Sequence, residues 1–367
     1  MFKRFSTYIV GYYGMQNTGD DALLYATRWA SHHLLSSQSN LVSSASHSKC
    51  KEFGDIQAIP DGLFRGHKRF LHYKNALQSE KVIFGGGSVF HTEADIQFKR
   101  HLITLAGRKQ SRCVGVGLGP FTSVGAEKAC GKFLSECGFI GVRDKQSYDI
   151  AKELCPEGNV ELTFDLVPIM LCHQKNKLVE IERNGIMFNF CQQAIDAYGN
   201  TDHKIELKRI QSAVEAIEKI YIETGEPIFL VDFNGHSIFS DFQVHRRIID
   251  QLNENIPITH ILYDPNPFRV LQRIAGFKAS VCMRLHASIM SFMAKTPSIS
   301  INYHNKCESW CEQIGMPEEY QFDALDVCTD NLTNTLIKGI GPEFAVPVMT
   351  TQEAIEATLL NWSQINE

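Results

Sequence analysis

Short β-rich runs alternate with longer amphipathic stretches along the whole chain, and this alternation limits the fold more strongly than any other feature of the sequence. It is the pattern of β-α-β units, in which parallel strands form a sheet and the connecting helices cover its faces. Strands are predicted at residues 7–12, 41–44, 81–84, 112–116, 139–142, 160–164, 185–190, 227–232, 259–263, 279–283 and 298–302. Helices are predicted at residues 20–35, 94–105, 125–137, 147–154, 203–223, 239–252 and 267–274. The pattern therefore predicts an α/β fold with doubly wound sheets.

The chain has 367 residues, more than one core of ordinary size holds, so two domains are expected. The strand series divides them into a first domain at residues 1–172, a polar linker at 173–184 and a second domain at 185–345. For residues 346–367 two arrangements stay open, a helix that packs back on the first domain and a helix that only caps the chain. Ligands of open α/β sheets bind beyond the carboxyl ends of the strands. We therefore expect two Rossmann-like doubly wound domains that face a cleft holding the active site.

The composition excludes several classes of protein. A formal net charge of −5 without a stripe of lysines and arginines argues against nucleic acid as a partner. Glycines and acidic residues interrupt the first apolar run, so neither a targeting segment nor a transmembrane segment is expected. Eleven cysteines without a CxxC pair predict reduced thiols and a cytoplasmic location. Cys307 and Cys311 fit buried thiols better than a zinc site, so no metal is expected.

Polar and glycine-rich segments follow the predicted strands of the first domain. In NTGDD, Asn17 and Asp20 stand at the start of a helix, where a cap and turn without chemistry and a functional role are equally consistent with the sequence. In GGGSVF, Gly86 and Gly87 are expected to form a turn that lets a ligand approach the backbone. In GVRD, Arg143 follows another strand, and either binds a ligand or forms a surface ion pair with Asp144.

In the second domain, cationic side chains follow two successive strands. Arg284 and His286 lie between a strand and an apolar helix in the segment RLHA, and Lys306 follows the next strand in YHNK. Neighbouring parallel strands end at the same edge of a sheet, so His286 and Lys306 are expected to face the same crevice. A single histidine is more often structural than catalytic, but a histidine grouped with two cations predicts a site for a small anion.

Taken together, these segments resemble the polysaccharide pyruvyl transferase family. The resemblance runs through nearly the whole chain and is carried by six motifs in order, NTGD, GGGSVF, GVGLGP, GVRD, RLHA and YHNK. It implies the two-Rossmann-domain architecture of the GT-B glycosyltransferases, with phosphoenolpyruvate as the donor. No cofactor is expected beyond phosphoenolpyruvate, which serves as a co-substrate.

The resemblance also implies roles for individual residues. Arg143, Arg284, Leu285 and Lys306 would bind phosphoenolpyruvate, because arginine forks and a lysine suit its phosphate and carboxylate. His286, with an ordinary pKa of about 6.5, would be the general acid that protonates the methylene carbon. On the acceptor side, Asp20 would take a proton from a sugar hydroxyl or orient it, with Asn17, Gly86 and Gly87 forming the backbone loop. Contacts to the sugar would come from the loops at residues 60–72 and 91–98.

Two other functions compete with this interpretation. One is a glycosyltransferase of the same fold that uses a nucleotide sugar, which would need a carboxylate for the ribose after Asp232 or Asp264. The other is an inactive carbohydrate-binding relative. Partners expected for the transferase are phosphoenolpyruvate and a sugar or glycan. A lipid-linked acceptor would bring the enzyme to the inner membrane face.

Overall fold

The computed structural model describes residues 4–45, 66–173, 178–179, 182–192, 202–238, 240–325, 329–341 and 344–363. The predicted linker at 173–184 and the predicted loop at 60–72 lie partly outside these residues. The chain divides into two compact units. The first unit contains Met1–Met15, Asp20–Lys175 and Gln352–Glu367, and the second contains Gln16–Gly19 and Asn176–Thr351. Each unit is therefore built from separate stretches of sequence.

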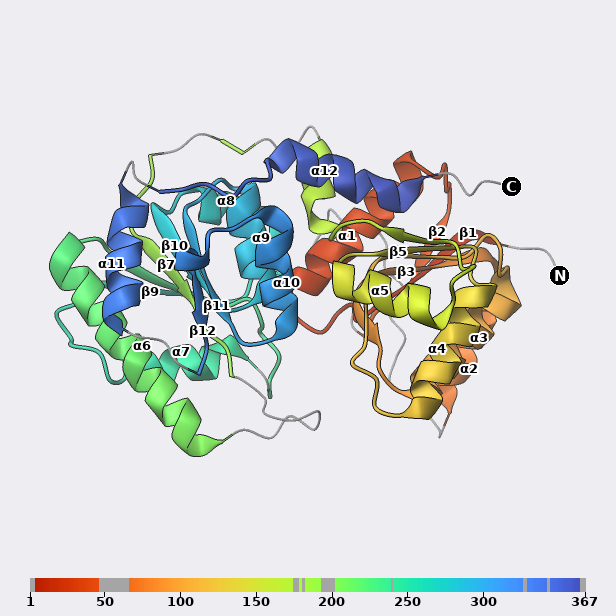
Figure 1. The fold of residues 1–367 in the computed structure, drawn as a ribbon, viewed down its shortest axis with the longest axis horizontal. Coiled ribbons are helices and arrows are strands. Elements are labelled where there is room, and N and C mark those ends of the chain that lie inside the picture. Colours follow the sequence, from red (N-terminus) through yellow and green to blue (C-terminus); the bar gives the residue numbers. More distant parts are fainter. Residues whose placement is uncertain are drawn as a thin grey trace. The chain divides into compact units, whose positions relative to one another are not determined.

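The first unit contains a six-stranded sheet in the order β2-β1-β3-β4-β5-β6, with every neighbouring pair parallel. Its strands are β1 (Phe5–Val10), β2 (Asn40–Val42), β3 (Ser79–Phe90), β4 (Arg112–Leu118), β5 (Phe139–Val142) and β6 (Val160–Leu162). Its helices are α1 (Thr18–His33), α2 (His67–Leu77), α3 (Glu93–Ala106), α4 (Val124–Glu136), α5 (Lys145–Leu154) and α12 (Thr351–Leu359), with the 3-10 helices η2 (Val167–Cys172) and η5 (Leu360–Trp362). In Figure 1 helices α2 to α5 lie in one layer against this sheet, and α1 covers the other face.

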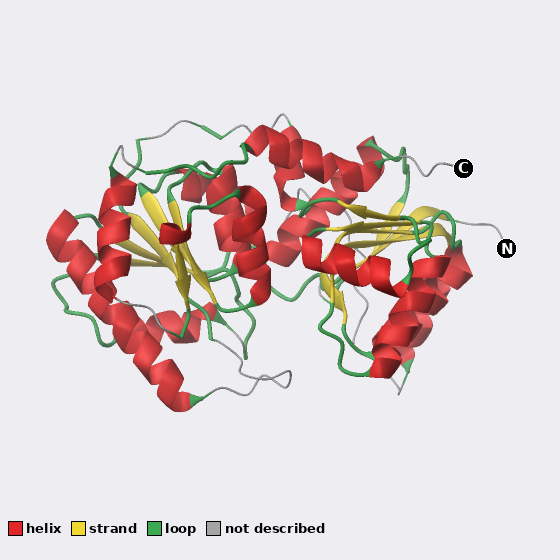
Figure 2. Cartoon of the chain, viewed as in Figure 1, coloured by secondary structure: helices red, strands yellow, loops and turns green. Residues whose placement is uncertain are grey.

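The second unit contains another parallel six-stranded sheet, in the order β12-β11-β10-β7-β8-β9. Its strands are β7 (Ile186–Asn189), β8 (Ile228–Val231), β9 (Ile258–Ile261), β10 (Ala279–Cys282), β11 (Ser298–Asn302) and β12 (Gln321–Asp323). Its helices are α6 (His203–Thr224), α7 (Asp241–Ile249), α8 (Pro267–Ala275), α9 (Leu285–Met293), α10 (Asn305–Ile314) and α11 (Thr329–Ile340), with the 3-10 helix η4 (Glu318–Tyr320). Strands alternate with helices throughout both units (Figure 2), which confirms the predicted α/β fold with two Rossmann-like domains.

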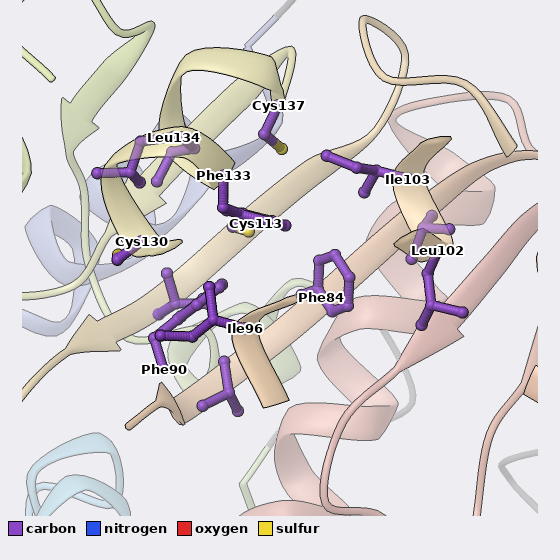
Figure 3. Packing of buried hydrophobic residues seen from close by; sticks show 14 of the residues in the cluster. Phe84, Phe90, Ile96, Leu102, Ile103, Cys113, Cys130, Phe133, Leu134 and Cys137 are labelled. Atoms are coloured by element: carbon purple, nitrogen blue, oxygen red, sulfur yellow. The ribbon is translucent and has the colours of Figure 1, made fainter. Parts of the chain in front are cut away.

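The strands are apolar because helices cover both faces of each sheet. Every residue of β4, β7 and β10 is buried, so these strands are mostly apolar and lack the alternation of a sheet exposed to water on one face. In the first unit three aromatic rings join the sheet to the helix layer (Figure 3). The ring of Phe133 on α4 lies 5.7 Å from that of Phe84 and 5.0 Å from that of Phe90, both on β3. This core packs β3 against α4.

Local signals explain where several helices begin and end. The Asn266 side chain accepts from the backbone N–H groups of Phe268 and Arg269 at 3.0 and 3.3 Å, and Pro267 opens α8 behind this cap. Helix α6 ends at Gly225, which adopts a left-handed φ of 64° that favours glycine. Such caps set the first turns of the helices at the strand ends, where the predicted site residues lie.

Residues 352–362 form part of the first unit through hydrogen bonds to its sheet. The fully buried Asn361 accepts from the Gly115 N–H at 2.6 Å and from the Thr163 hydroxyl at 2.8 Å, and donates to the Phe164 carbonyl at 3.0 Å. Thr358 donates to the Asp165 carbonyl at 2.8 Å. The amide of Asn361 therefore satisfies backbone groups between β4 and β6 that would otherwise be buried without partners.

Among the described residues, no helix is long and apolar enough to cross a membrane. The described cysteines are all free thiols, and Cys307 and Cys311 are both buried.

Candidate functional site

The strand order of the second sheet changes direction between β10 and β7, and ligand sites of open α/β sheets gather at such a point. Asn189 ends β7, and Arg284 follows β10 on the neighbouring strand. Arg284 is also the residue that precedes α9, so its position is set by both the strand and the helix. The RLHA motif thus lies where the sheet geometry places a ligand.

A buried carboxylate holds the Arg284 guanidinium. Arg284 Nε lies 2.8 and 3.0 Å from the two carboxylate oxygens of Asp241, and Nη2 lies 2.6 Å from Oδ1. Asp241 is 0% exposed. Burial by itself lowers the pKa of Arg284, but the charge of Asp241 outweighs it and the net shift is upward. Arg284 therefore stays charged in a place that is largely removed from water.

Asp241 also fixes the neighbouring strand ends. Its Oδ2 accepts from the backbone N–H groups of Phe233 and Asn234 at 2.9 and 3.1 Å, and from Asn189 Nδ2 at 3.2 Å. The Asn189 side chain in turn accepts from the Arg284 N–H at 3.0 Å. Asn189 and Asp241 were not predicted from the sequence. A signal was present, because Asn189 is a polar residue in an apolar strand.

His286 packs against the glycine of the first motif. A Cβ added at Gly19 would stand 2.1 Å from His286 Nδ1, so the imidazole ring lies directly on the glycine backbone. Gly19 belongs to the second unit because residues 16–19 bind the segment after β8. The Thr18 N–H donates to the Phe233 carbonyl at 2.8 Å, and the Asn17 side chain accepts from the Gly19 N–H at 2.9 Å. The structure thus brings NTG and RLHA, which are far apart in sequence, into contact.

Lys306 occupies the same helical position as His286, one strand further along the sheet. It is the second residue of α10, as His286 is the second residue of α9, and the two helices follow the paired strands β10 and β11. The His304 side chain caps α10 by accepting from the Lys306 N–H at 3.2 Å, and Lys306 Nζ lies 5.4 Å from the centre of the Tyr303 ring. Leu285 is buried at the start of α9. Two helix N-termini and two cations therefore gather at this edge of the sheet.

Arg143 belongs to the first unit, at the end of β5, and is 6% exposed. Its Nη2 donates to the Ser88 hydroxyl at 3.1 Å, and its Nη1 lies 3.4 Å from Asp165 Oδ2. Arg143 Nε lies 3.8 Å from Asp144 Oδ2. The Asp144 carboxylate also caps α5, because its Oδ1 accepts from the Ser147 N–H at 2.7 Å. Arg143 therefore does pair with Asp144, but at a buried position among acceptors and not on the surface.

The three glycines of GGGSVF lie inside β3 and not in the turn that the sequence predicted. Gly85 and Gly87 pair with Val114 and Val116 of β4. Gly86 has a φ of 76°, and a Cβ there would stand 2.6 Å from the Leu23 side chain of α1. Gly87 has a φ of 82°, and a Cβ there would make only an ordinary contact, 3.7 Å from the Val89 side chain. Gly86 and Gly87 thus continue the strand in a conformation that other residues rarely adopt.

Asp20 lies in the first turn of α1, in the first unit. Its charge affects the pKa of Tyr12. Burial raises the pKa of Tyr12, and the charges of Asp95 and Asp20 raise it further. Asp20 therefore lies within electrostatic range of the loop that follows β1.

Asp232, His245 and His260 bring one possible metal-ligating atom each to within 4.8 Å of one another. His245 Nδ1 and His260 Nε2 lie 2.6 and 2.8 Å from the same Asp232 oxygen. The Phe190 N–H donates to His245 Nε2 at 2.9 Å, so Nδ1 of the neutral ring carries the proton given to Asp232. Burial raises the pKa of Asp232, but its histidine partners lower it by more. The hydrogen bonds to Asp232 therefore explain why these three side chains lie together.

Solved structures similar to this chain show its fold. A putative UDP-N-acetylglucosamine 2-epimerase from Listeria monocytogenes has a TM-score of 0.64 at 11% identity, covering 96% of this chain and 93% of that one. The UDP-GlcNAc 2-epimerase from Methanocaldococcus jannaschii has a TM-score of 0.62 at 12% identity, with 97% and 98% covered. The lipopolysaccharide outer core galactosyltransferase WaaB has a TM-score of 0.54 at 10% identity, with 97% of each covered. Together with the two parallel sheets, these similarities establish the two-domain GT-B fold.

Sequence comparisons identify the family. The amylovoran biosynthesis protein AmsJ of Erwinia amylovora is 22% identical over an alignment of 257 residues, with 66% of this chain and 61% of that protein covered. The chain thus matches about three fifths of the length of this relative. The family model for polysaccharide pyruvyl transferase matches residues 17–305, a range that begins at Asn17 and ends just after the strand β11. It contains His286, Arg284 and the segments that hold them, and the chain belongs to the polysaccharide pyruvyl transferase family.

Proposed function

We propose that this chain transfers the pyruvyl group of phosphoenolpyruvate to two hydroxyls of one sugar, in a cell-surface glycan or its precursor. The products are a ketal and phosphate. The observation that carries this proposal is the grouping of Arg284, His286 and Lys306 at the switch point of the second sheet, in a chain of this family. A small, highly charged anion suits two fixed cations and two helix N-termini.

The donor is assigned to the second unit through Arg284. Its guanidinium is held by Asp241 through Nε and Nη2, and its side chain is 18% exposed, so a carboxylate or phosphate can approach it. Lys306 supplies a point charge from the next helix, and Leu285 supplies an apolar wall for the methylene group. Arg143, buried in the first unit beside Ser88, remains a predicted donor residue on the strength of the sequence motif.

The reaction balances without a further reactant. A proton adds to the methylene carbon, which becomes a methyl group, and the first sugar hydroxyl bonds to the adjacent carbon and loses its proton. The carbon–oxygen bond to phosphate then breaks, and phosphate leaves with the bonding electron pair. The second hydroxyl bonds to the same carbon and loses its proton, which closes the ketal. The two hydroxyls release two protons. One of them makes up for the proton that entered the methyl group, and the other goes to phosphate.

Three residues are proposed for the proton and charge transfers. His286 is the general acid for the methylene carbon, since imidazole titrates near neutral pH. Lys306 stabilises the charge that develops on the leaving phosphate. Asp20 accepts a proton from the acceptor hydroxyl or orients it. Asn17 fixes the backbone on which the His286 ring rests, through its bond to Gly19.

The competing use of a nucleotide sugar would require a free carboxylate for the ribose. Asp232 accepts from His245 and His260, and Asp264 pairs with Arg269 and Arg273 at 2.9 and 3.3 Å. The two carboxylates that stand where these loops begin therefore have internal partners. This supports phosphoenolpyruvate as the donor.

The proposal also covers the place of action. We expect a cytoplasmic enzyme that reaches the inner membrane face when its acceptor is attached to a lipid. Sedimentation of the protein with vesicles that carry the lipid-linked acceptor, and not with plain vesicles of the same lipid, would support this location. Equal sedimentation with both kinds of vesicle would contradict it.

Calorimetric titration tests the donor. Phosphoenolpyruvate and UDP-sugars are titrated separately into the wild-type protein, Arg284→Ala, Arg143→Ala and the control Arg246→Ala, whose side chain is exposed on α7 and pairs with Asp250 at 3.1 Å. We expect wild type and the control to bind phosphoenolpyruvate, and Arg284→Ala and Arg143→Ala to lose it. Binding of UDP-sugars without binding of phosphoenolpyruvate would overturn the proposal.

A further inference from the structure

A cavity of about 320 Å³ opens in the first unit beyond the carboxyl ends of β1, β2 and β3. Its walls come from the loop after β1 and from helices α2 and α3. We call it the first-unit pocket and define it by its side chains Tyr12, Met15, Lys68, His72, Asp95 and Phe98. It lies beside the switch point of its sheet, between β1 and β3, where a ligand site is expected.

The pocket has aromatic walls. Tyr12 lines the pocket and is 54% exposed, so its ring is accessible to a ligand. Phe98 is half-buried, and its ring lies 5.2 Å from that of His72 in an edge-to-face arrangement. An exposed ring beside a half-buried one gives a ligand an apolar face to stack on.

His72 supplies a hydrogen-bond donor. Burial lowers the pKa of His72 to about 4, with further lowering by the charges of Lys68 and Lys99, so the ring is neutral near pH 7. His72 Nδ1 lies 2.7 Å from the Tyr8 hydroxyl. With the tyrosine donating to Nδ1, the proton of the neutral ring is on Nε2, and this N–H can be given to a ligand oxygen.

The pocket carries charges of both signs. Lys99 Nζ pairs with Asp95 Oδ2. The charges of Lys68 and Lys99 lower the pKa of His72, and those of Asp95 and Asp20 raise the pKa of Tyr12. Carboxylates accept hydrogen bonds from hydroxyls, and imidazole and ammonium groups donate to oxygens. A polyhydroxylated ring has both kinds of partner.

We propose that the first-unit pocket binds one pyranose ring of the acceptor glycan. The ring stacks on Tyr12, donates a hydroxyl hydrogen to Asp95 and accepts from His72. This assignment deepens the proposed function and rests on it for the use that is made of the sugar. Asp20, which acts on the same tyrosine, is then near the hydroxyls of a ring bound there.

Methyl NMR tests the pocket directly, because Met15 lines it and is 40% exposed. The whole protein is labelled with ¹³C at its methionine methyl groups, and the Met15 signal is assigned with Met15→Leu. Methyl glycosides of glucose, galactose, mannose and glucuronic acid are titrated separately, without phosphoenolpyruvate. We expect at least one of them to shift the Met15 signal in a saturable way.

Two matched aromatic variants test whether the sugar binds at Tyr12. Tyr12→Ala should lower the affinity for the sugar by about tenfold, because a stacking ring is lost. Phe70→Ala is the control, since Phe70 is 59% exposed on α2 and does not line the pocket. Three results would each overturn the proposal. They are saturable binding of a glycoside that does not shift the Met15 signal, equal glycoside affinity of Tyr12→Ala and wild type, and no binding of any glycoside.

The two proposals fail separately. If phosphoenolpyruvate binds and is turned over while Met15 does not respond to sugars, the function stands and the pocket assignment is wrong. If sugars shift Met15 in wild type but not in Tyr12→Ala, while phosphoenolpyruvate does not bind, the pocket stands as a carbohydrate site and the transfer reaction is wrong.

Discussion

Asp241 and Arg284 lie 43 positions apart in the sequence and form a two-point ion pair at the end of the second sheet, with the carboxylate fully buried. Asp241→Asn keeps the shape but removes the charge. Because a buried guanidinium then loses its partner, the free energy of unfolding should fall by about 3 kcal/mol. Urea denaturation measures this change. An Asp241→Asn protein as stable as wild type would show that the pair does not support the site.

The same pair should also be visible in donor binding. The KM for phosphoenolpyruvate should rise in Asp241→Asn more than kcat falls, because Arg284 is loosened while the general acid is not touched. In a double-mutant cycle with Arg284→Gln, the two losses should be far from additive. Additive losses would mean that Asp241 acts on the fold alone.

His286→Ala should lower kcat by roughly 10²- to 10⁴-fold, the usual contribution of a positioned general acid. Phosphoenolpyruvate binding should persist, since Arg284 and Lys306 remain. Phosphate release measured at saturating donor gives kcat, and calorimetry gives the binding. A folded His286→Ala protein with wild-type turnover would refute the assignment.

Gly19→Ala tests the contact between the first motif and His286. The added methyl group would stand 2.1 Å from Nδ1, so the imidazole must move. Turnover should fall although alanine favours the helix that starts at Thr18. The sharp measurement is the double variant, because Gly19→Ala should cause no further loss in a His286→Ala background. A second, independent loss there would place the effect of Gly19 elsewhere.

His72 should make the protein sensitive to mild acid. Its pKa of about 4 in the folded protein lies below its ordinary value near 6.5, so the unfolded chain binds more protons between these two values. Stability is therefore complete above pH 6.5 and falls as the pH decreases toward 4, by at most about 1.4 kcal/mol per pH unit. His72→Asn keeps an acceptor for Tyr8 and should show a smaller slope in urea denaturation across this range. Equal slopes would contradict the assignment.

Asn361→Leu should destabilise the first unit. The Gly115 N–H and the Phe164 carbonyl would lose their partner inside the fold, at about 1–3 kcal/mol for each group. Gln352→Ala, at an exposed position of α12, is the control and should change stability by less than about 0.5 kcal/mol. Similar stabilities of the two variants would show that the amide is dispensable.

The buried parallel strands were predictable because their apolar runs are continuous. β5 and β11 match their predicted ranges of 139–142 and 298–302, and the predictions for β7 and β10 were close. Helices α2, α10 and α11 were not predicted, nor was the short strand β12 (Gln321–Asp323), whose residues are half-buried or exposed. An exposed edge strand leaves little apolar pattern, so sequence alone identifies it poorly.

The site could be predicted only where a motif follows a strand. Arg284, His286 and Lys306 were found in this way, since each opens a helix at the carboxyl edge of a sheet. Asp241 was missed because the sequence shows an acidic residue at a helix start, which usually serves as a cap. Its role depends on contacts with distant segments, which no local pattern records. The glycines of β3 were misplaced for a related reason, because three successive glycines are typical of turns.

The division of the chain into interleaved stretches has a consequence for how the protein is made. Neither unit can be produced as one uninterrupted stretch of sequence, because the first needs residues 352–362 and the second needs residues 16–19. During synthesis, residues 176–351 emerge before the segment that carries Asn361. The sheet of the first unit therefore cannot be completed until the whole of the second unit has been translated, because the Gly115 N–H lacks its amide partner until then.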